Sequence, residues 1–421
     1  MKLSKTFTFL ILNLLISTAV AKNINTATQI FNPSFATLKI QQADNFYAPP
    51  IININNGEQI VVCFDEISDD VSYLQYHLIH CNSDWQPSQL IDSEFVDGFN
   101  IANIEDYAFS SNTFIHYVNY RIVIPNQDIK PIVSGNYLLQ VFPENEPENV
   151  ILQARFSIDE AQITISGDIT TQTDKGFNDH WQQLDFSIDT KLYKVNDPYL
   201  DLITIIEQNG RTDNAVTITH PQRVSGTKIF YEHNPNLIFP AANEFRRFET
   251  VRANYPGMGI DSTRYINDRY HAFMRINEER ASSQYLYDQT QYGRFMIDEY
   301  NSTDPDLGAD YIDTHFYLDF PQLINADIYV DGEFTNHQYS EDNRMIYNSK
   351  TNLYELTMTL KQGSYNYQFL AIPHNGRIGE VSLIEGNHYE TVNEYVIKVY
   401  HRSPGSRADK LIGYYVVYSG K

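Results

Sequence analysis

The sequence predicts an all-β protein made of tandem immunoglobulin-like β-sandwich domains. The first observation behind this prediction is the aromatic content. The 421 residues include 31 Tyr and 24 Phe, and aromatic side chains suit a pleated, half-buried surface. The second is that short alternating apolar runs recur between turn dipeptides at the spacing typical of sandwiches. The third is that no stretch of helical length keeps apolar residues at i, i+3 and i+4.

Five turn dipeptides punctuate the chain, each of the Asn-Gly or Asp-Gly kind that permits positive φ. They are Asn56-Gly57, Asp97-Gly98, Asn209-Gly210, Asp331-Gly332 and Asn375-Gly376. The strand-like runs lie at residues 59–64, 73–80, 117–124, 137–142, 151–158, 184–188, 202–207, 311–318, 354–360 and 365–371. The best helical candidate, residues 243–252, has polar residues on all its faces, so we expect a loop or a short turn there.

The N-terminus has the pattern of a secretory signal peptide. Lys2 and Lys5 precede an apolar run at residues 7–16, and small residues close it at Ala19-Val20-Ala21. We therefore predict a signal peptide at residues 1–21, cleaved after Ala21. The apolar run is shorter than the roughly 20 residues that span a bilayer, so we expect export without direct membrane insertion.

Two boundaries divide the rest of the chain into three predicted units. One follows Phe156-Ser157-Ile158-Asp159, and the other lies in the polar, Pro- and Gly-containing segment at residues 301–308, which is typical of a linker. The units are an N-terminal β-sandwich at 22–159, a middle β-rich domain at 160–300 and a C-terminal β-sandwich at 301–421. Each has about the size of one sandwich. Residues 244–291 alternate least clearly, and their structure is left open.

The charge balance excludes several classes of partner. The formal net charge is −23, and removal of residues 1–21 would leave 28 basic against 53 acidic side chains. Binding to nucleic acid depends on Lys and Arg that displace counterions from phosphates. Such an acidic chain is therefore a poor binder of nucleic acid and of anionic membrane surfaces.

The two cysteines are expected to be buried thiols. Cys63 and Cys81 fall in consecutive predicted strands joined by a turn near Ser68. In such a hairpin Cys63 would face about position 73, far from Cys81, whereas bridged Cα atoms lie within about 7 Å. A disulfide remains the open alternative, because an exported protein meets an oxidising compartment.

No metal site is predicted. On a strand, His77 and Cys81 share one face while His80 points to the other. At most two of the three could bind one ion, and structural zinc normally takes four nitrogen or sulfur ligands. We therefore assign no metal and no cofactor.

No catalytic residue is predicted either. The chain lacks a Gly-x-Ser-x-Gly elbow, a glycine-rich phosphate loop and a His-Glu-x-x-His motif. Asp179, His180, Trp181 and Asp185 lie close in sequence without forming a recognisable acid–base pair. We predict that the protein is not an enzyme, although a hydrolase with paired carboxylates on a sandwich would leave little trace in the sequence.

One stretch and three turn dipeptides carry a family resemblance. His80-Cys81-Asn82-Ser83-Asp84-Trp85 is followed by Asp97-Gly98, Asn209-Gly210 and Asp331-Gly332. Together they resemble the plug proteins of the type IX secretion system, an outer-membrane export machine of Bacteroidetes-type bacteria. Further matching segments are Phe64-Asp65 and residues 208–215, 239–246, 362–367, 385–391 and 411–414. We interpret His80, Cys81, Asn82, Asp84, Trp85, Asp97, Gly98, Asn209, Gly210, Asp331 and Gly332 as mostly structural, with Trp85 buried or partly buried.

The resemblance implies a non-catalytic periplasmic plug or gating subunit. Such a protein would close the periplasmic end of the translocon pore by protein–protein binding. Its implied partner is the large outer-membrane translocon barrel, through which it would associate peripherally with the outer membrane. The sequence assigns no residue to the partner-binding surface.

An envelope carbohydrate-binding β-sandwich protein is the alternative. Asp331-Gly332-Glu333-Phe334 and residues 345–347, 354–356 and 362–369 resemble the sandwich modules that bind glycogen or starch. Those modules place Trp at the sugar, whereas this unit contains none, since the only tryptophans are Trp85 and Trp181. The resemblance therefore favours the sandwich more than the sugar, and burial of Trp85 and Trp181 would count against it.

Overall fold

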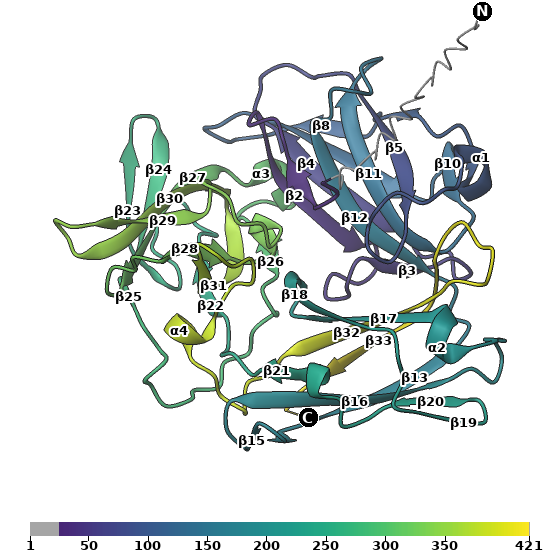
Figure 1. The fold of residues 1–421 in the computed structure, drawn as a ribbon. Coiled ribbons are helices and arrows are strands. Elements are labelled where there is room, and N and C mark those ends of the chain that lie inside the picture. The colour runs from purple at the N-terminus through teal and green to yellow at the C-terminus, as the bar shows by residue number, and fades with distance from the viewer. Residues whose placement is uncertain (1–24, 421) are drawn as a thin grey trace, which may run out of the picture.

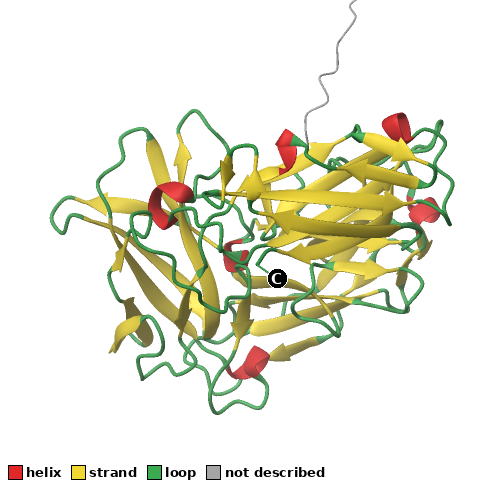
Figure 2. Cartoon of the chain, turned by 90° about the horizontal axis from the view of Figure 1, so that it is seen from below, coloured by secondary structure: helices red, strands yellow, loops and turns green. Residues whose placement is uncertain are grey.

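The computed structural model describes residues 25–420 (Figure 1). Strands account for 48% and helices for 6% of the structure, which confirms the all-β prediction. The α-helices are single turns, as Figure 2 shows in red. They are α1 (Asp92–Phe95), α2 (Pro198–Asp201), α3 (Pro305–Gly308) and α4 (Ser382–Glu385). The chain also contains the 3-10 turns η1 (Pro235–Leu237) and η2 (Glu333–Thr335). The predicted signal peptide at residues 1–21 lies outside the described residues.

Residues 25–159 form a two-sheet sandwich, the first sandwich. One sheet has the order β1-β12-β11-β5-β7 with β3 beside β12, and the other has the order β2-β4-β9-β8. The first contains β1 (Gln29–Ile30), β12 (Leu152–Asp159), β11 (Gly135–Pro143), β5 (Leu74–Cys81), β7 (Ala102–Asn103) and β3 (Ile51–Asn53). The second contains β2 (Phe35–Gln42), β4 (Ile60–Glu66), β9 (Val118–Ile124) and β8 (Tyr107–Phe109), and β6 (Val96–Gly98) pairs with β10 (Ile129–Pro131) at the side.

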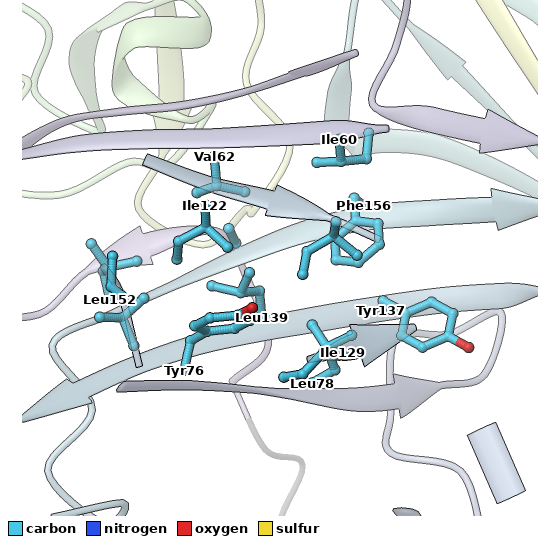
Figure 3. Packing of buried hydrophobic residues seen from close by; sticks show 14 of the residues in the cluster. Ile60, Val62, Tyr76, Leu78, Ile122, Ile129, Tyr137, Leu139, Leu152 and Phe156 are labelled. Carbon is cyan, nitrogen blue, oxygen red and sulfur yellow. The ribbon is translucent and has the colours of Figure 1, made fainter. Parts of the chain in front are cut away.

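The core of the first sandwich comes from alternate residues of the facing strands. In Figure 3, Val62 and Ile122 approach from one sheet and Leu139 and Leu152 from the other. All four side chains are at most 3% exposed. A strand turns every second side chain to one face, so the alternating runs in the sequence are sufficient to build this core.

A second sandwich packs two further sheets together. One has the order β13-β16-β20-β19 with β21 beside β16, and the other has the order β18-β17-β32-β33. The first contains β13 (Thr164–Thr170), β16 (Trp181–Asp189), β20 (Lys228–Tyr231), β19 (Arg223–Ser225) and β21 (Ile238–Pro240), with the small hairpin β14 (Gln172–Thr173) and β15 (Gly176–Phe177) nearby. The second contains β18 (Arg211–Ile218), β17 (Leu202–Gln208), β32 (Glu394–His401) and β33 (Lys410–Tyr418). Leu184, Ile206 and Ile397 meet in the core between the two sheets.

The remaining strands form one ten-stranded, barrel-like sheet. Its order is β22-β31-β28-β29-β30-β27-β24-β23, with β25 beside β27 and β26 beside β31. The strands are β22 (Arg246–Glu249), β31 (Gly363–Pro373), β28 (Ala326–Asp331), β29 (Arg344–Asn348), β30 (Leu353–Lys361), β27 (Tyr311–Asp319), β24 (Arg269–Met274), β23 (Ile260–Ile266), β25 (Asn277–Glu278) and β26 (Phe295–Ile297). Phe248 and Ile260, from the two end strands, share one core with Phe316, so the sheet curls around its own interior.

The barrel-like sheet is inserted into the second sandwich. The chain leaves that sandwich after β21, builds the barrel-like sheet and returns as β32 and β33. In Figure 1 these two yellow strands lie beside the teal strand β17. The observed sheets therefore divide the chain differently from the predicted units, because strands of residues 160–300 and 301–421 pair with one another in two sheets.

The strand predictions are confirmed, and the likeness to immunoglobulin domains stays a prediction. Each of the ten predicted runs overlaps a strand: β4, β5, β9, β11, β12, β16, β17, β27, β30 and β31. The expectation of a loop at residues 243–252 is wrong in part, because Arg246–Glu249 forms β22. This strand is formed by long-range hydrogen bonding to β31. A local sequence pattern does not predict such pairing.

The cysteines are free thiols, with Cys81 buried and Cys63 half-buried. The expected hairpin between their strands is wrong, since β4 and β5 lie in opposite sheets of the first sandwich. Within residues 25–420, no helix has the length and apolar character needed to cross a membrane.

Because β32 pairs with β17 and shares its core, a core substitution in β32 should also destabilise β17. Ile397, with a fully buried side chain, packs in the core that β17 shares. We expect Ile397→Ala to destabilise the protein by about 2–5 kcal/mol and to lower hydrogen-exchange protection of the amides in β17. Leu192→Ala, at a side chain 86% exposed, is the control and should change stability by less than about 0.5 kcal/mol. Loss of protection confined to β27 and β30 would contradict the observed pairing.

Candidate functional site

A buried ion pair joins the first sandwich to the barrel-like sheet. Lys361 Nζ, at the end of β30, lies 2.6 Å from Asp65 Oδ2 of β4, and both side chains are 1% exposed. The same carboxylate accepts hydrogen bonds from the Tyr311 hydroxyl at 2.6 Å and from Asn119 Nδ2 at 2.8 Å. Burial raises the pKa of Asp65, and the nearby Lys361 opposes this rise. The carboxylate therefore depends on these donors to stay charged.

Aromatic rings surround the lysine of this pair. Lys361 Nζ lies 4.0 Å from the centre of the Tyr117 ring. The Tyr117 hydroxyl donates to the Ala309 carbonyl at 2.8 Å, across the same boundary. Nearby, the Asp310 carboxylate accepts the backbone N–H groups of Phe114 and Ile115 at 2.7 and 3.0 Å. The two units are therefore joined by matched polar groups, of which the Asp65–Lys361 pair is fully buried.

The His80–Trp85 stretch joins the first sandwich to the β32–β33 hairpin. The Ser83 N–H donates to Asp409 Oδ2 at 2.8 Å, and the Asp409 N–H donates to Asn82 Oδ1 at 3.2 Å. The Asn136 side chain bridges further, because it donates to the Asn82 carbonyl and accepts from the Tyr400 hydroxyl at 2.8 Å. This motif is a joint within the chain.

His80 and Cys81 stabilise the end of β5. His80 is buried, and its ring nitrogens lie 3.0 Å from Ser88 Oγ and 3.1 Å from the Ser134 carbonyl. Burial lowers the pKa of His80 and raises that of the Cys81 thiol to about 12. A neutral imidazole and a protonated thiol are packing groups here. Among the described residues no group of three His, Cys, Asp or Glu side chains is placed to hold a metal ion.

Two more motif positions, Asp97 and Gly98, lie apart from the other motifs in β6. Both are exposed, and Gly98 pairs with Ile129 of β10. Its φ of 109° suits glycine, and a Cβ there would lie 2.6 Å from the Asp128 carbonyl oxygen. Asp84 is likewise exposed and caps its own turn by accepting the Gln86 N–H at 3.0 Å. Their geometry is that of turn residues.

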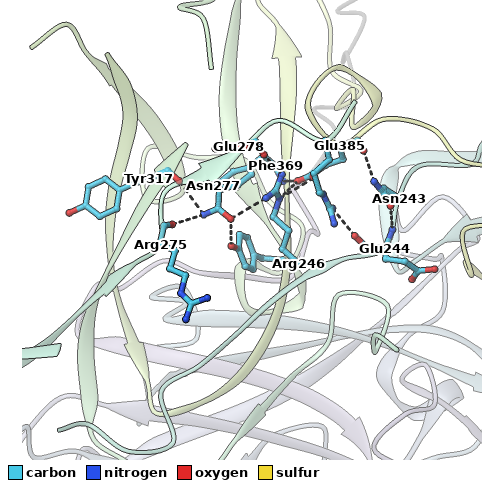
Figure 4. A network of polar contacts seen from close by, with 11 residues as sticks. Asn243, Glu244, Arg246, Arg275, Asn277, Glu278, Tyr317, Phe369 and Glu385 are labelled. Atoms are coloured by element: carbon cyan, nitrogen blue, oxygen red, sulfur yellow. Dashed lines mark hydrogen bonds and ion pairs between the residues drawn. The ribbon is translucent and has the colours of Figure 1, made fainter. Parts of the chain in front are cut away.

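A second polar network links the two segments that connect the second sandwich to the barrel-like sheet, one entering the sheet and one leaving it (Figure 4). Glu385, 1% exposed, lies 2.9 Å from Arg246 Nε and 2.7 Å from Arg280. Burial opposes ionisation, but the two guanidinium groups outweigh it and lower the pKa of Glu385. The Glu385 carbonyl also accepts Asn243 Nδ2 at 2.7 Å. The entering segment at Asn243 and the leaving segment at Glu385 are thus held together.

The three units meet around a cavity, here called the junction cavity, of about 1060 Å³ including its solvent-filled mouth. The first sandwich contributes an apolar wall, and β17, β32 and η2 contribute charged side chains. Lys398 Nζ lies 2.6 Å from Glu207, and Arg294 lies 2.8 Å from Glu394. These two pairs neutralise most of the charge on the far wall.

Three of the predicted motifs converge on this cavity. Trp85, Asn209 and Gly210 line it, as do residues directly after Asp331-Gly332. The Asn209 side chain fixes its turn by donating to Asn393 Oδ1 at 2.7 Å and accepting the Glu394 N–H at 2.9 Å. Gly210, at φ 72°, faces the ring of the cavity-lining His337, since a Cβ would come within 3.4 Å of it.

The Asp331-Gly332 turn fixes the position of the His337 ring through the Asp331 carboxylate. Asp331, 0% exposed, lies 3.0 Å from His337 Nδ1 and accepts Gln368 Nε2 at 2.8 Å. Burial alone would lower the pKa of His337, but Asp331 and then Glu333 outweigh it and raise the pKa above 6.5. A Cβ on Gly332 would lie 2.6 Å from the Asn366 carbonyl oxygen, so only glycine fits the start of η2.

The partial burial predicted for Trp85 is confirmed, and its neighbour Arg155 was missed. Trp85 is half-buried at φ 63°, and the Arg155 guanidinium lies 4.4 Å from its ring centre. No sequence motif marks Arg155, Arg294, Lys361 or Lys398. Arg155 lies within a predicted apolar strand and Lys361 directly follows one, where charges are rare unless paired, whereas Arg294 and Lys398 lie outside the predicted strands.

Residues 35–160 match the family model described as "Type 9 secretion system plug protein 1st domain". This range is the first sandwich almost from end to end. The first sandwich is therefore a plug protein first domain of the type 9 secretion system family.

One solved structure resembles the whole chain. A hypothetical protein from Parabacteroides merdae is 38% identical, covers 94% of this chain and 100% of its own, and has a TM-score of 0.93. At that similarity the two share one fold over all three units.

Other solved structures resemble this protein far less. An alkylpurine DNA glycosylase from Pseudomonas fluorescens, bound to DNA containing an abasic site analog, is 10% identical over 30% of both chains, with a TM-score of 0.19. A partial N-terminal region of an enterococcal surface protein is 7% identical over 94% of this chain and 96% of its own, at 0.21. Neither supports an argument. No curated protein matches the chain.

The buried pair between Asp65 and Lys361 gives the first prediction for this site. Asp65→Asn keeps the shape but leaves Lys361 without its counter-charge, so we expect a loss of about 3–5 kcal/mol of unfolding free energy. Asp65→Asn combined with Lys361→Met should recover part of that loss, because the uncompensated charge is gone. Denaturant titration measures both.

A solvent-exposed pair provides the control for that experiment. Asp106 and Arg121 are paired at 3.3 Å with side chains 65% and 46% exposed. Asp106→Asn should change stability by no more than about 1 kcal/mol. Equal effects of Asp65→Asn and Asp106→Asn would show that the buried joint has no special role.

The raised pKa of His337 predicts a pH-dependent contribution to stability. In the folded state His337 keeps its proton above pH 6.5, so its pairing with Asp331 stabilises fully below 6.5 and is lost as pH rises through the raised value. The difference in unfolding free energy between wild type and His337→Gln should therefore be largest near pH 6 and shrink towards pH 9. Urea titrations at several pH values test this, with His116→Gln at the surface as the matched control. A difference that grows with pH would contradict the assignment.

Proposed function

We propose that this protein is a non-catalytic periplasmic plug that closes the periplasmic end of the type 9 secretion translocon by binding to its outer-membrane barrel. The match of residues 35–160 to the plug protein first domain is the observation that carries this proposal. Under it, the protein is exported to the periplasm and associates with the outer membrane through its partner.

The joints between the units support a role as a stopper. A stopper must keep its shape when the pore is loaded from one side. Here the units are linked by the returning strands β32 and β33, by the buried pair of Asp65 with Lys361 and by the Glu385 network. Separating them would leave buried charges unpaired, which costs several kcal/mol for each broken pair. The three units would therefore move as one body.

Closure also has to be reversible, which favours a polar contact of moderate size. The most exposed large apolar side chains stand on separate loops of the three units: Phe99 at 89%, Leu192 at 86% and Ile324 at 85%. Apolar residues scattered singly on a surface are ordinary and mark no interface by themselves, so these three positions serve as probes of each unit.

The sugar-binding alternative has less support. Sugar recognition by aromatic residues needs free ring faces, and a cation lies over each tryptophan. Arg155 is 4.4 Å from the Trp85 ring centre and Lys175 is 4.3 Å from that of Trp181. One face of each ring is thus occupied.

Site-specific crosslinking in cells tests the plug proposal. A photo-crosslinking residue placed at Phe99, Leu192 or Ile324 samples each unit in turn, and all three positions are exposed enough to accept it. We expect at least one of them to capture the outer-membrane barrel of the type 9 machine. The same residue at the buried position Leu139 is the control and should capture nothing.

The leak of small solutes through the translocon provides the second readout. Adding the purified protein to open translocon in vesicles should reduce the leak. If no position captures the barrel and the leak is unchanged, the plug proposal is wrong.

A further inference from the structure

Arg155 differs from the other arginines that lie deep in this protein. Arg211, Arg246 and Arg294 each have a carboxylate oxygen within 2.9 Å. Arg155 has no carboxylate at ion-pair distance anywhere in residues 25–420. It donates Nε to the Thr26 carbonyl at 2.7 Å and Nη2 to Thr26 Oγ1 at 2.8 Å. Both acceptors are neutral, so the charge is only partly compensated.

The pKa of Arg155 is shifted in the opposite direction to the pKa values of the paired arginines, which are raised. Burial lowers the pKa of Arg155 to about 10. Burial acts on Arg246 too, but Glu385 outweighs it and keeps the pKa of Arg246 raised. The carboxylate that acts most on Arg155 is Glu207, and that carboxylate is already bonded to Lys398 at 2.6 Å. The Arg155 site is thus short of negative charge.

One wall beside Arg155 in the junction cavity is apolar, opposite the wall that carries the two ion pairs. Trp85 stacks on its guanidinium, and the same wall of the first sandwich continues through Leu38, Ile40, Pro49 and Pro50. The space in the cavity that the centre of a water molecule can occupy is about 160 Å³, well above the roughly 10–15 Å³ that a single water needs. A cation without a carboxylate partner beside an apolar wall can hold the head of an amphiphile while the wall buries its tail.

We propose that the junction cavity binds an amphiphilic organic anion, with its acid group at Arg155 and its apolar part against Trp85 and the adjoining wall. The acid would supply the missing counter-charge through charge-assisted hydrogen bonds, which are among the strongest in proteins. A cationic head would be repelled by Arg155, and a neutral one would leave its charge as it is. This site is separate from the exposed loops considered for the translocon.

Trp85 is a built-in reporter for this site. The chain has only two tryptophans, so Trp181→Phe leaves the emission of Trp85 alone. Titration of this variant with sodium decanoate should change the emission saturably. Decyltrimethylammonium has the same tail and the opposite charge, and should produce no saturable change at equal concentration.

Substitutions at Arg155 test the role of the cation. On the Trp181→Phe background, Arg155→Met should weaken decanoate binding by about tenfold or more, since a charge-assisted contact is lost. Arg155→Lys keeps the charge and should still prefer decanoate over decyltrimethylammonium. Lys175→Met removes the cation that lies over the other tryptophan and should leave the titration unchanged.

Three results would overturn the proposal: no saturable response to decanoate, equal responses to both head groups, or full decanoate affinity in Arg155→Met. If Arg155→Met does not fold, the comparison of head groups and Arg155→Lys still decide the question. None of these outcomes depends on whether the protein binds the translocon.

Discussion

The arrangement of the three units depends on the buried contact between Asp65 and Lys361. These residues are 296 positions apart in the chain, and both are almost completely removed from water. A charge buried this deeply is tolerated only opposite its partner, so the barrel-like sheet can dock on the first sandwich in one register. That register also sets where η2 stands relative to β12. The width of the junction cavity follows from it.

The insertion of one unit into another adds a second constraint. Because β32 and β33 complete the second sandwich, its core requires the segment that follows the barrel-like sheet in the chain. The Glu385 network fixes the two crossing segments side by side. Loop closure over so long a segment adds little entropy cost for each further residue, whereas the shared core makes the two units depend on each other for stability.

The sequence predicted the strands well because a strand's alternation is local. It did not predict which strands pair, since the ladder between Leu202 and His401 joins segments with no common pattern. For the same reason the motif turns were found, yet their meeting around the junction cavity was not. Arg155 and Lys361 could be flagged only as cations in apolar surroundings, because their partners lie in distant segments. Strands and turns can be predicted from one sequence because they depend on neighbouring residues. Strand pairing and ion pairs between distant segments cannot.

The walls of the junction cavity come from all three units, and this links occupancy to assembly. A ligand that binds only the docked arrangement stabilises it by RT ln(1 + [L]/Kd), about 2.7 kcal/mol at a hundredfold excess over Kd. That amount is comparable to the loss expected from breaking one buried pair. An amphiphilic anion at Arg155 would therefore strengthen the same joints that Asp65 and Glu385 hold, and its removal would loosen all three units together.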